Sequence, residues 1–263
     1  MNRILTSIGF ALLIALTGGC SSSKDKPDQT KNWSADRLYT EAKTLLDAGS
    51  WEKAAKMFET LESRYPYGKY AQQAQLDIAY AYYKQDESVS AVAAADRFIK
   101  LHPNHPNVDY AYYLKGLANF KDDLGLFGQF SGQDLSERDQ KAAREAFDTF
   151  KELVTRYPDS LYAPDSAKRM DFLVNSLASN EVHIAGYYYR RGAYVAAVNR
   201  AQNAVNNYPR APAVEEALAL MVASYEKLGL TDLRNDTARV LKTNFPNSKY
   251  AAGSINSPWW RLW

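Results

Sequence analysis

Five steps in which an aromatic residue or histidine precedes proline divide the chain, and their spacing constrains its fold more than any other feature. The first two prolines lie 37 residues apart, as do the last two, and the middle gaps of 55 and 51 residues equal one period plus an insertion. Proline cannot continue a helix and pushes the residue before it out of the α region, so each step should end a helix. A period in the thirties is typical of stacked helical hairpins. The steps are Tyr65-Pro66, His102-Pro103, Tyr157-Pro158, Tyr208-Pro209 and Phe245-Pro246.

Alignment of the segments by their prolines gives a second, independent indication of repeats. Residues 49–54 (GSWEKA) coincide with residues 192–197 (GAYVAA) without a gap. The glycine is expected to end the first helix of a hairpin in a left-handed cap, and the alanine to let the second helix approach its neighbour closely. Small residues recur at matching positions of the first helices (Ala42, Ala79, Ala185) and of the second helices (Ala54, Ala91, Ala146, Ala197).

These positions resemble those of the tetratricopeptide repeat, from about residue 35 to residue 246. The sequence therefore predicts an all-α fold, a superhelix of five helical hairpins in which each repeat packs on the next. In the third hairpin, the glycine-containing insertion at 122–135 suggests an ordered loop. In the fourth, the extra length should extend the first helix from about Ala163 to Arg191, so that it bridges an N-terminal half (34–160) and a C-terminal half (161–250). The expected hairpins are 34–66, 69–103, 106–158, 161–209 and 211–246.

The first 19 residues have the features of a signal peptide: a basic residue, a short apolar run and small residues before Cys20. Cys20 is the only cysteine, and its surroundings match the bacterial lipoprotein pattern, so we expect it to carry the lipid anchor. By resemblance to sorted lipoproteins, Ser21 after the cysteine favours the outer membrane over retention at the inner one. Residues 20–33 are rich in serine and charge, which predicts a flexible, lipidated tether.

Composition and motifs argue against catalysis. The formal net charge is only +2, which does not suggest a nucleic-acid partner. The sequence has no glycine-rich phosphate loop, serine nucleophile elbow or paired cysteine motif. Of the three histidines, His102 and His105 lie in a proline-interrupted turn and are expected to be solvated rather than metal ligands, and His183 to be a packing residue. We therefore expect no enzyme, no cofactor and no metal site.

Tyrosine runs on the first helices are the best candidates for a binding surface. First helices line the concave side of such a superhelix, and tyrosine combines apolar area with a hydroxyl, which suits a groove for polypeptide. The competing explanation is that many of these rings form the core between repeats. The three runs lie at 80–83, 110–113 and 187–189. The candidate substrate contacts are Tyr82, Tyr83, Tyr112 and Tyr113.

Two arginines near the turn of the fourth hairpin are candidates for partner binding. The planar guanidinium group suits bidentate pairing with a carboxylate of a partner, although solvation is the usual role of surface charge. These residues are Arg191 and Arg200. The segment 251–263 is an aromatic tail with three tryptophans, which would either cap the last repeat or dock on a partner.

Several strings are more specific than a repeat consensus: RYPYGKY at 64–70, AYAYYK at 79–84, HPNVDY at 105–110 and RGAYVAAVNR at 191–200. With the lipoprotein pattern, the five repeats and the insertion, the chain resembles the BamD family of outer-membrane β-barrel assembly lipoproteins over almost its whole length. The aromatic tail has no counterpart in that pattern.

This resemblance implies a non-enzymatic subunit on the periplasmic face of the outer membrane. It implies that the N-terminal repeats bind unfolded outer-membrane proteins, that the C-terminal repeats dock on the periplasmic domains of BamA, and that BamC wraps the N-terminal half. By the same resemblance, Arg64, Tyr65, Tyr67 and Gly68 belong to the substrate-recognising half, and Arg200 to the BamA-facing half.

Two alternatives remain open from the sequence. A periplasmic tetratricopeptide scaffold of the cell-division or Tol type also uses steps such as YPDS at 157–160, although such proteins typically carry an N-terminal coiled coil and no heptad run precedes Ser34. A cell-wall hydrolase with helical repeats is a distant third.

Overall fold

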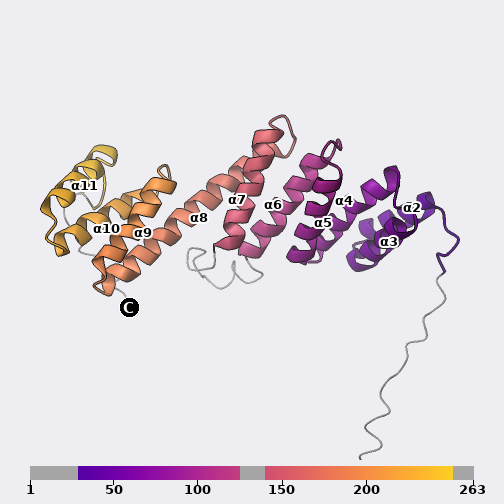
Figure 1. Cartoon of the computed structure of the whole chain (residues 1–263), viewed down its shortest axis with the longest axis horizontal. Helices are drawn as coiled ribbons and strands as arrows, with labels where there is room; N and C mark the ends of the chain where they lie inside the picture. Colours follow the sequence, from indigo (N-terminus) through magenta and orange to yellow (C-terminus); the bar gives the residue numbers. More distant parts are fainter. Residues whose placement is uncertain (1–28, 125–139, 251–263) are drawn as a thin grey trace, which may run out of the picture.

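A computed structural model describes residues 29–124 and 140–250, and in these residues every regular element is an α-helix (Figure 1). This confirms the predicted all-α class. The helices are α2 (Ala35–Asp47), α3 (Trp51–Arg64), α4 (Lys69–Lys84), α5 (Ser88–Leu101), α6 (Val108–Leu124), α7 (Lys141–Arg156), α8 (Ala163–Arg190), α9 (Tyr194–Asn207), α10 (Val214–Lys227) and α11 (Thr231–Asn244).

The helices form five consecutive hairpins that stack into an elongated superhelix (Figure 1). We call the first helix of each hairpin helix A and the second helix B. Each helix packs on the next along the chain, and α4 also contacts the helices A on both sides of it, α2 and α6. Every hairpin therefore buries its apolar faces against neighbours in sequence, as expected of a solenoid.

The aromatic-proline steps end every helix B with the same backbone geometry. The five residues before proline have φ between −129° and −132° and ψ between 52° and 69°, outside the α region. Each still donates its N–H to the carbonyl four residues earlier, which closes the last turn. The predicted role of these steps is therefore confirmed, and its cause is local: the proline ring excludes the helical conformation of the residue before it.

The turns inside three hairpins use glycine in the left-handed region, as the sequence predicts for Gly49 and Gly192. Gly49, Gly192 and Gly229 have φ of 73°, 75° and 72°. In the second hairpin the matching residue is Asp86, with φ of 63°. A side chain at such a backbone conformation is strained, although aspartate tolerates it better than most residues.

Replacement of Asp86 by glycine should therefore stabilise the protein. We expect Asp86→Gly to raise the free energy of unfolding by about 0.5–1 kcal/mol, because glycine adopts this conformation without strain. The reciprocal change Gly229→Ala should lower it by about 1–2 kcal/mol at the same turn position. Urea unfolding followed by circular dichroism measures both, and equal stability of Asp86→Gly and the wild type would contradict the strain argument.

The core consists of small residues at the helix crossings and large residues between them. The alanines that the sequence alignment singled out are all 0–2% exposed, which confirms the predicted close approach of the helices. Phe58, Phe98 and Phe150, one in each of the first three helices B, are fully buried. Within residues 29–124 and 140–250, clusters of buried side chains follow one another along the superhelix.

Helix α8 joins the two ends of the superhelix. It is 28 residues long, about 42 Å at 1.5 Å per residue, and its bounds agree with the long helix expected from the sequence. Leu173 and Leu177 pack in a cluster with α6 and α7, whereas Ala178, Val182 and Ala185 pack in the next cluster with α9 and α10. The rigid helix therefore fixes the last two hairpins relative to the first three.

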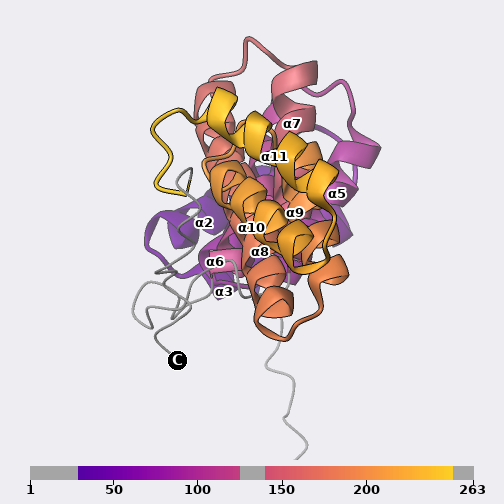
Figure 2. The ribbon, with the colours of Figure 1, turned by 90° about the vertical axis from the view of Figure 1, so that its left-hand side faces the viewer.

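The last described helix, α11, is exposed along most of its length. Seen end-on, it lies outermost, in front of α10 (Figure 2). Four residues before the proline that follows helix B, Ile99 and Val154 pack against a buried cluster of the core. The matching residue of α11 is the exposed Lys242. Among the residues of α11, Leu241 is buried. Leu233 and Val240 of α11 are 48% and 42% exposed, so the exposed surface of this helix is partly apolar.

Two boundaries differ from the sequence prediction. The tether was expected to extend to residue 33, but residues 29–32 form a turn and Trp33 packs partly buried against the first cluster of the core. The insertion was expected to begin at residue 122, but α6 continues to Leu124. The expected signal peptide, Cys20, the tether up to residue 28, residues 125–139 of the insertion and the tail at 251–263 lie outside the described residues.

Candidate functional site

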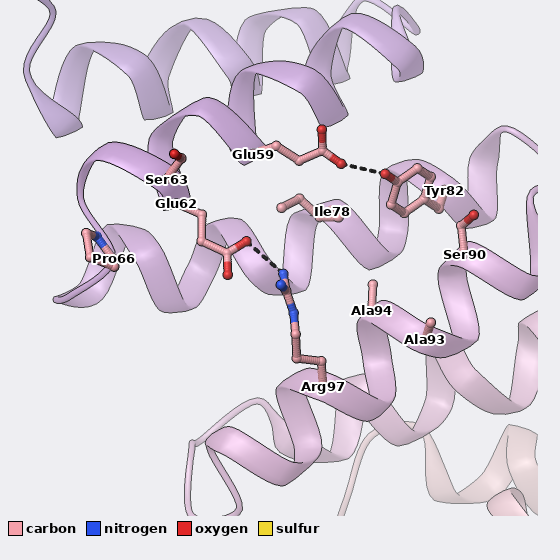
Figure 3. A pocket seen from close by; sticks show the side chains of 10 residues that line it. All are labelled: Glu59, Glu62, Ser63, Pro66, Ile78, Tyr82, Ser90, Ala93, Ala94 and Arg97. Atoms are coloured by element: carbon pink, nitrogen blue, oxygen red, sulfur yellow. Dashed lines mark hydrogen bonds and ion pairs between the residues drawn. The ribbon is translucent and has the colours of Figure 1, made fainter.

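A groove of about 760 Å³ opens in the N-terminal half between α3 and α5 (Figure 3). Two helices B form its walls, and Ile78 and Tyr82 of α4 form its floor. The floor and part of the walls are apolar, with polar groups at the rim, which is the usual composition of a site that binds another molecule. The lining residues are Glu59, Glu62, Ser63, Pro66, Ile78, Tyr82, Ser90, Ala93, Ala94 and Arg97.

Hydrogen bonds fix the polar groups of the groove (Figure 3). The Tyr82 hydroxyl donates to Glu59 Oε1 at 2.5 Å, and this bond raises the pKa of Tyr82 to about 12. Across the groove, Arg97 Nη2 donates to Glu62 Oε2 at 2.7 Å, and Gln75 Nε2 donates to Glu62 Oε1 at 2.9 Å. The pair of Glu62 and Arg97 links α3 to α5, so the two walls are held at a fixed separation.

Small side chains on α5 keep the groove open. Ser90, Ala93, Ala94 and Arg97 form one face of this helix, at the spacing i, i+3, i+4, i+7, and they point toward α3. Alanine fills little of the space between two helices, so a gap remains above the floor. The sequence analysis predicts a groove lined by helices A, whereas the walls of this groove are helices B. The stripe of small residues on α5 is the sequence feature that indicates it.

The helix A tyrosines instead fill much of the space between neighbouring hairpins. Tyr39 and Tyr70 have ring centroids 5.3 Å apart, and Tyr113 stacks on Tyr162 at 4.7 Å. Many of the tyrosine hydroxyls bond to carboxylates, as that of Tyr113 does to Asp165 at 2.7 Å. The alternative that these rings form the core between repeats therefore holds for much of this face.

Three of the four tyrosines predicted as substrate contacts lie in such packing. Tyr112 is only 4% exposed, and its hydroxyl donates to Glu152 at 2.9 Å, so its ring is not available to a ligand. Tyr113 is stacked as described, and Tyr83 packs partly buried against two clusters of the core. Tyr82 is the member of this set that lines the groove.

Asp77 of α4 is a buried carboxylate that faces α2. It is 7% exposed, and it accepts hydrogen bonds from Tyr39 at 3.2 Å and Gln73 at 3.4 Å, with Lys43 Nζ at 3.7 Å. Burial raises the pKa of Asp77 in spite of these partners. The ionised Asp77 carboxylate therefore lowers the stability of the folded protein at neutral pH.

The raised pKa of Asp77 predicts a specific dependence of stability on pH. As the pH falls from 7 toward about 4, the ordinary range for aspartate, the folded protein takes up this proton before the unfolded chain does. The stability of the wild type relative to Asp77→Asn should therefore rise over this window and then level off. Urea unfolding of both proteins at several pH values measures the difference, and a difference that is constant with pH would contradict the prediction.

Arg64 and Tyr65, at the end of α3, bind the chain's own N-terminal segment. Arg64 Nη1 donates to the carbonyl oxygen of Thr30, and the Tyr65 hydroxyl donates to the carbonyl oxygen of Trp33 at 2.8 Å. The two residues thus sit together at one corner of the first hairpin, as their positions in the sequence required. Their hydrogen-bonding groups already have partners there.

The next residues of this corner are open to solvent. Tyr67 is 91% exposed, and Gly68 has φ of 99°, a conformation that favours glycine. Pro66, between these residues and α3, lines the groove. The structure therefore brings the predicted residues at 64–68 next to the groove that contains Tyr82.

The two candidate partner-binding arginines have different surroundings. Arg191, at the end of α8, is exposed, and its guanidinium lies 5.4 Å from the ring centroid of Tyr187, which is itself 45% exposed. Arg200 Nη1 instead donates to Glu181 Oε2 at 3.3 Å, and Arg144 lies 3.7 Å from the other oxygen of this buried glutamate. Arg200 thus has an internal partner that the sequence did not indicate.

The sequence predicts that the two turn histidines are solvated, and this prediction is wrong, because both are packed. Both rings lie 5.2 Å from the ring centroid of Phe98, and His102 Nε2 bonds to Gln75 Oε1 at 2.8 Å. Burial beside His102 lowers the pKa of His105. Over residues 29–124 and 140–250, no group of three or more His, Cys, Asp or Glu residues is placed to hold a metal ion.

The described helices include none with both the length and the apolar character needed to cross a bilayer. The long helix α8 carries charged and polar residues along its length and packs against its neighbours in the superhelix.

Comparison with known proteins agrees with the architecture. A family model described as "YfiO: Outer membrane lipoprotein" matches residues 31–241. The outer membrane protein assembly factor BamD of Neisseria meningitidis serogroup B is 48% identical, with 100% of both chains aligned. The BamD of Vibrio cholerae is 39% identical over 89% of this chain and 95% of its own, and that of Haemophilus influenzae 35% identical over 92% and 91%. The chain therefore belongs to the YfiO family of outer membrane lipoproteins, which includes the assembly factors named BamD.

Proposed function

We propose that this chain is a non-enzymatic, lipid-anchored subunit of the outer-membrane β-barrel assembly complex. Its N-terminal half (34–160) binds unfolded outer-membrane proteins, and its C-terminal half (161–250) docks on the periplasmic domains of BamA. Family membership supports the role in assembly, and the observation that carries the binding proposal is the open groove between α3 and α5.

The groove suits a segment of polypeptide. Tyr82, Ala93 and Ala94 offer apolar area to side chains, and the hydroxyl and carboxylate groups at its rim offer hydrogen bonds to a main chain. Tyr82 lies inside it, and Tyr67 and Gly68 are exposed beside it, so these three predicted residues are its contacts in the proposal. Arg64 and Tyr65 adjoin the same end. Tyr83, Tyr112 and Tyr113 support the fold from within.

Docking on BamA is assigned to the surface around the end of α8. Arg191 and Tyr187 are exposed there, and an exposed arginine over a tyrosine ring is a favourable group for pairing with a carboxylate of a partner. Arg200 contributes through its remaining exposed surface while it pairs with Glu181. BamC is proposed to wrap the N-terminal half.

The anchor is assigned to lipidated Cys20, which holds the chain on the periplasmic face of the outer membrane. Membership of a family of outer membrane lipoproteins supports this assignment. A scaffold of the cell-division or Tol type, the alternative left open by the sequence, has no comparable support, because the relatives named above are BamD assembly factors.

Filling the groove tests the binding proposal. Ala93 is exposed in the groove wall, and Ala93→Arg would place a long side chain there with little loss of helix propensity. We expect the affinity for a synthetic peptide with the C-terminal strand of an outer-membrane β-barrel protein to fall by about tenfold or more, since contacts in the centre of an interface dominate its affinity. Fluorescence anisotropy of the labelled peptide measures this.

Asp148→Arg provides the matched control. Asp148 lies 55 residues after Ala93, the distance between the prolines of the second and third hairpins, so it has the same register on α7 and is exposed. It should bind the peptide as the wild type does. Unchanged affinity of Ala93→Arg would remove the groove from the proposal.

A further inference from the structure

The N-terminal segment of the described chain is bound at the corner that adjoins the groove. The carbonyl oxygens of Thr30 and Trp33 accept hydrogen bonds from Arg64 and Tyr65, residues 34 and 32 positions further along the chain. Thr30 also accepts the Trp33 N–H at 2.9 Å, which closes the turn. The Arg37 guanidinium lies 4.2 Å from the Trp33 ring centroid, and the ring packs partly buried against the first core cluster.

The third hairpin shows what the same pair of residues does elsewhere. Arg156 and Tyr157 precede Pro158 as Arg64 and Tyr65 precede Pro66. There, Arg156 Nη1 bonds to Glu152 at 2.7 Å and to the Tyr112 hydroxyl at 2.6 Å, so it is paired with side chains of its own hairpin. At the first hairpin, the pair holds main-chain carbonyls instead.

The chemistry of these contacts defines the ligand that the corner takes. Both acceptors are main-chain carbonyl oxygens, which every polypeptide carries whatever its side chains. A cationic guanidinium and a phenol are strong donors for such oxygens. The corner is continuous with the groove, because Pro66, the residue after Tyr65, lines it. A polypeptide that lies in the groove and extends past Pro66 meets these donors.

We infer that residues 30–33 are a resident occupant of a main-chain-binding subsite, formed by Arg64 and Tyr65, which bound polypeptide takes over. The inference rests on the proposed function, since the incoming ligand is the polypeptide of the groove. The segment therefore competes with substrate. The apparent affinity equals the intrinsic affinity multiplied by the fraction of molecules in which the segment has left the corner.

Displacement is measured on the mature full-length protein by hydrogen exchange of the Trp33 amide, with the C-terminal strand peptide as the probe. Saturation with peptide should make this amide exchange about tenfold faster or more, because its bond to Thr30 is lost when the turn leaves the corner. The Ser160 amide, which bonds to Tyr157 in the third hairpin, should not change. A Trp33 amide that exchanges at the same rate or more slowly with peptide bound overturns the inference.

Three substitutions test the competition, and a fourth is their control. Arg37→Ala and Trp33→Ala loosen the segment but leave Arg64 and Tyr65 intact, so each should bind the peptide about 3- to 10-fold more tightly. Arg37 is exposed, so its variant remains informative where loss of the Trp33 ring unfolds the first hairpin. Tyr65→Phe removes a donor that the segment and the peptide both use, so its affinity should stay closer to the wild type than that of Arg37→Ala, and the matched Tyr157→Phe should bind as the wild type does.

The outcomes separate the two proposals. Absence of peptide binding by the wild type and by all variants overturns the proposed function and the inference with it. Peptide binding that is unaffected by Arg37→Ala and Trp33→Ala overturns the inference alone and leaves the groove as the site.

Discussion

Gly116→Ala should destabilise the protein, although alanine is the better helix former. Gly116 is a buried residue of α6, and a Cβ at this position would lie 2.4, 2.7 and 2.8 Å from three atoms of the Phe150 ring in α7. The ring is fully buried and packs near Tyr113 and Phe120, so it has no free direction in which to move. We expect the free energy of unfolding to fall by about 1–3 kcal/mol, the usual range for overpacking.

Gly186→Ala is the matched control for this substitution. Gly186 is also a buried glycine inside a helix, α8, but a Cβ there meets only Arg190 Nη1, at 3.5 Å. Its replacement should raise the stability by up to about 1 kcal/mol, the difference in helix propensity. Urea unfolding of both variants gives the comparison. A stabilised Gly116→Ala protein would show that α6 and α7 separate easily at this crossing.

Arg200→Glu should lower the free energy of unfolding by about 2–4 kcal/mol, because it places a second carboxylate beside buried Glu181. Arg144 remains 3.7 Å from Glu181 and offsets only part of this repulsion. The same variant should also bind BamA more weakly, but loss of binding would then follow partly from loss of structure. Thermal unfolding and a pull-down with the periplasmic domains of BamA measure the two effects.

Arg191→Glu separates docking from stability. Arg191 is exposed and its described contact is with the face of Tyr187, so reversal of its charge should change the stability by less than about 0.5 kcal/mol. If the end of α8 meets BamA, the affinity should still fall, by about 5- to 10-fold. Full binding by Arg191→Glu, together with weak binding by the unstable Arg200→Glu, would remove this surface from the docking proposal.

The positions of the helices were predictable because the signals that end them act locally. A proline excludes the α conformation of the residue before it, and a glycine tolerates the left-handed turn, whatever the rest of the chain does. The five steps and the turn glycines therefore gave the hairpins and the long α8. Asp86 shows the limit of this reasoning. Its residue type does not indicate a left-handed backbone conformation, and only its alignment with the turn glycines does.

The roles of individual side chains depended on residues far away in the sequence. Tyr112 lies among buried residues because α7 packs over it, and a helical pattern does not show which rings a neighbouring helix covers. The pairing of Arg200 with Glu181 spans 19 residues. The groove exists because small residues of α5 face α3, a relation between two hairpins.

The sequence by itself determined that this protein is a stack of five helical hairpins and where each hairpin begins and ends, since proline and glycine set the backbone through their own covalent structure. Only the tertiary structure decided which tyrosines are open, where the groove lies and that Arg64 and Tyr65 hold Thr30 and Trp33. These properties arise from contacts between side chains that the superhelix brings together, and such contacts leave no periodic signal along the chain.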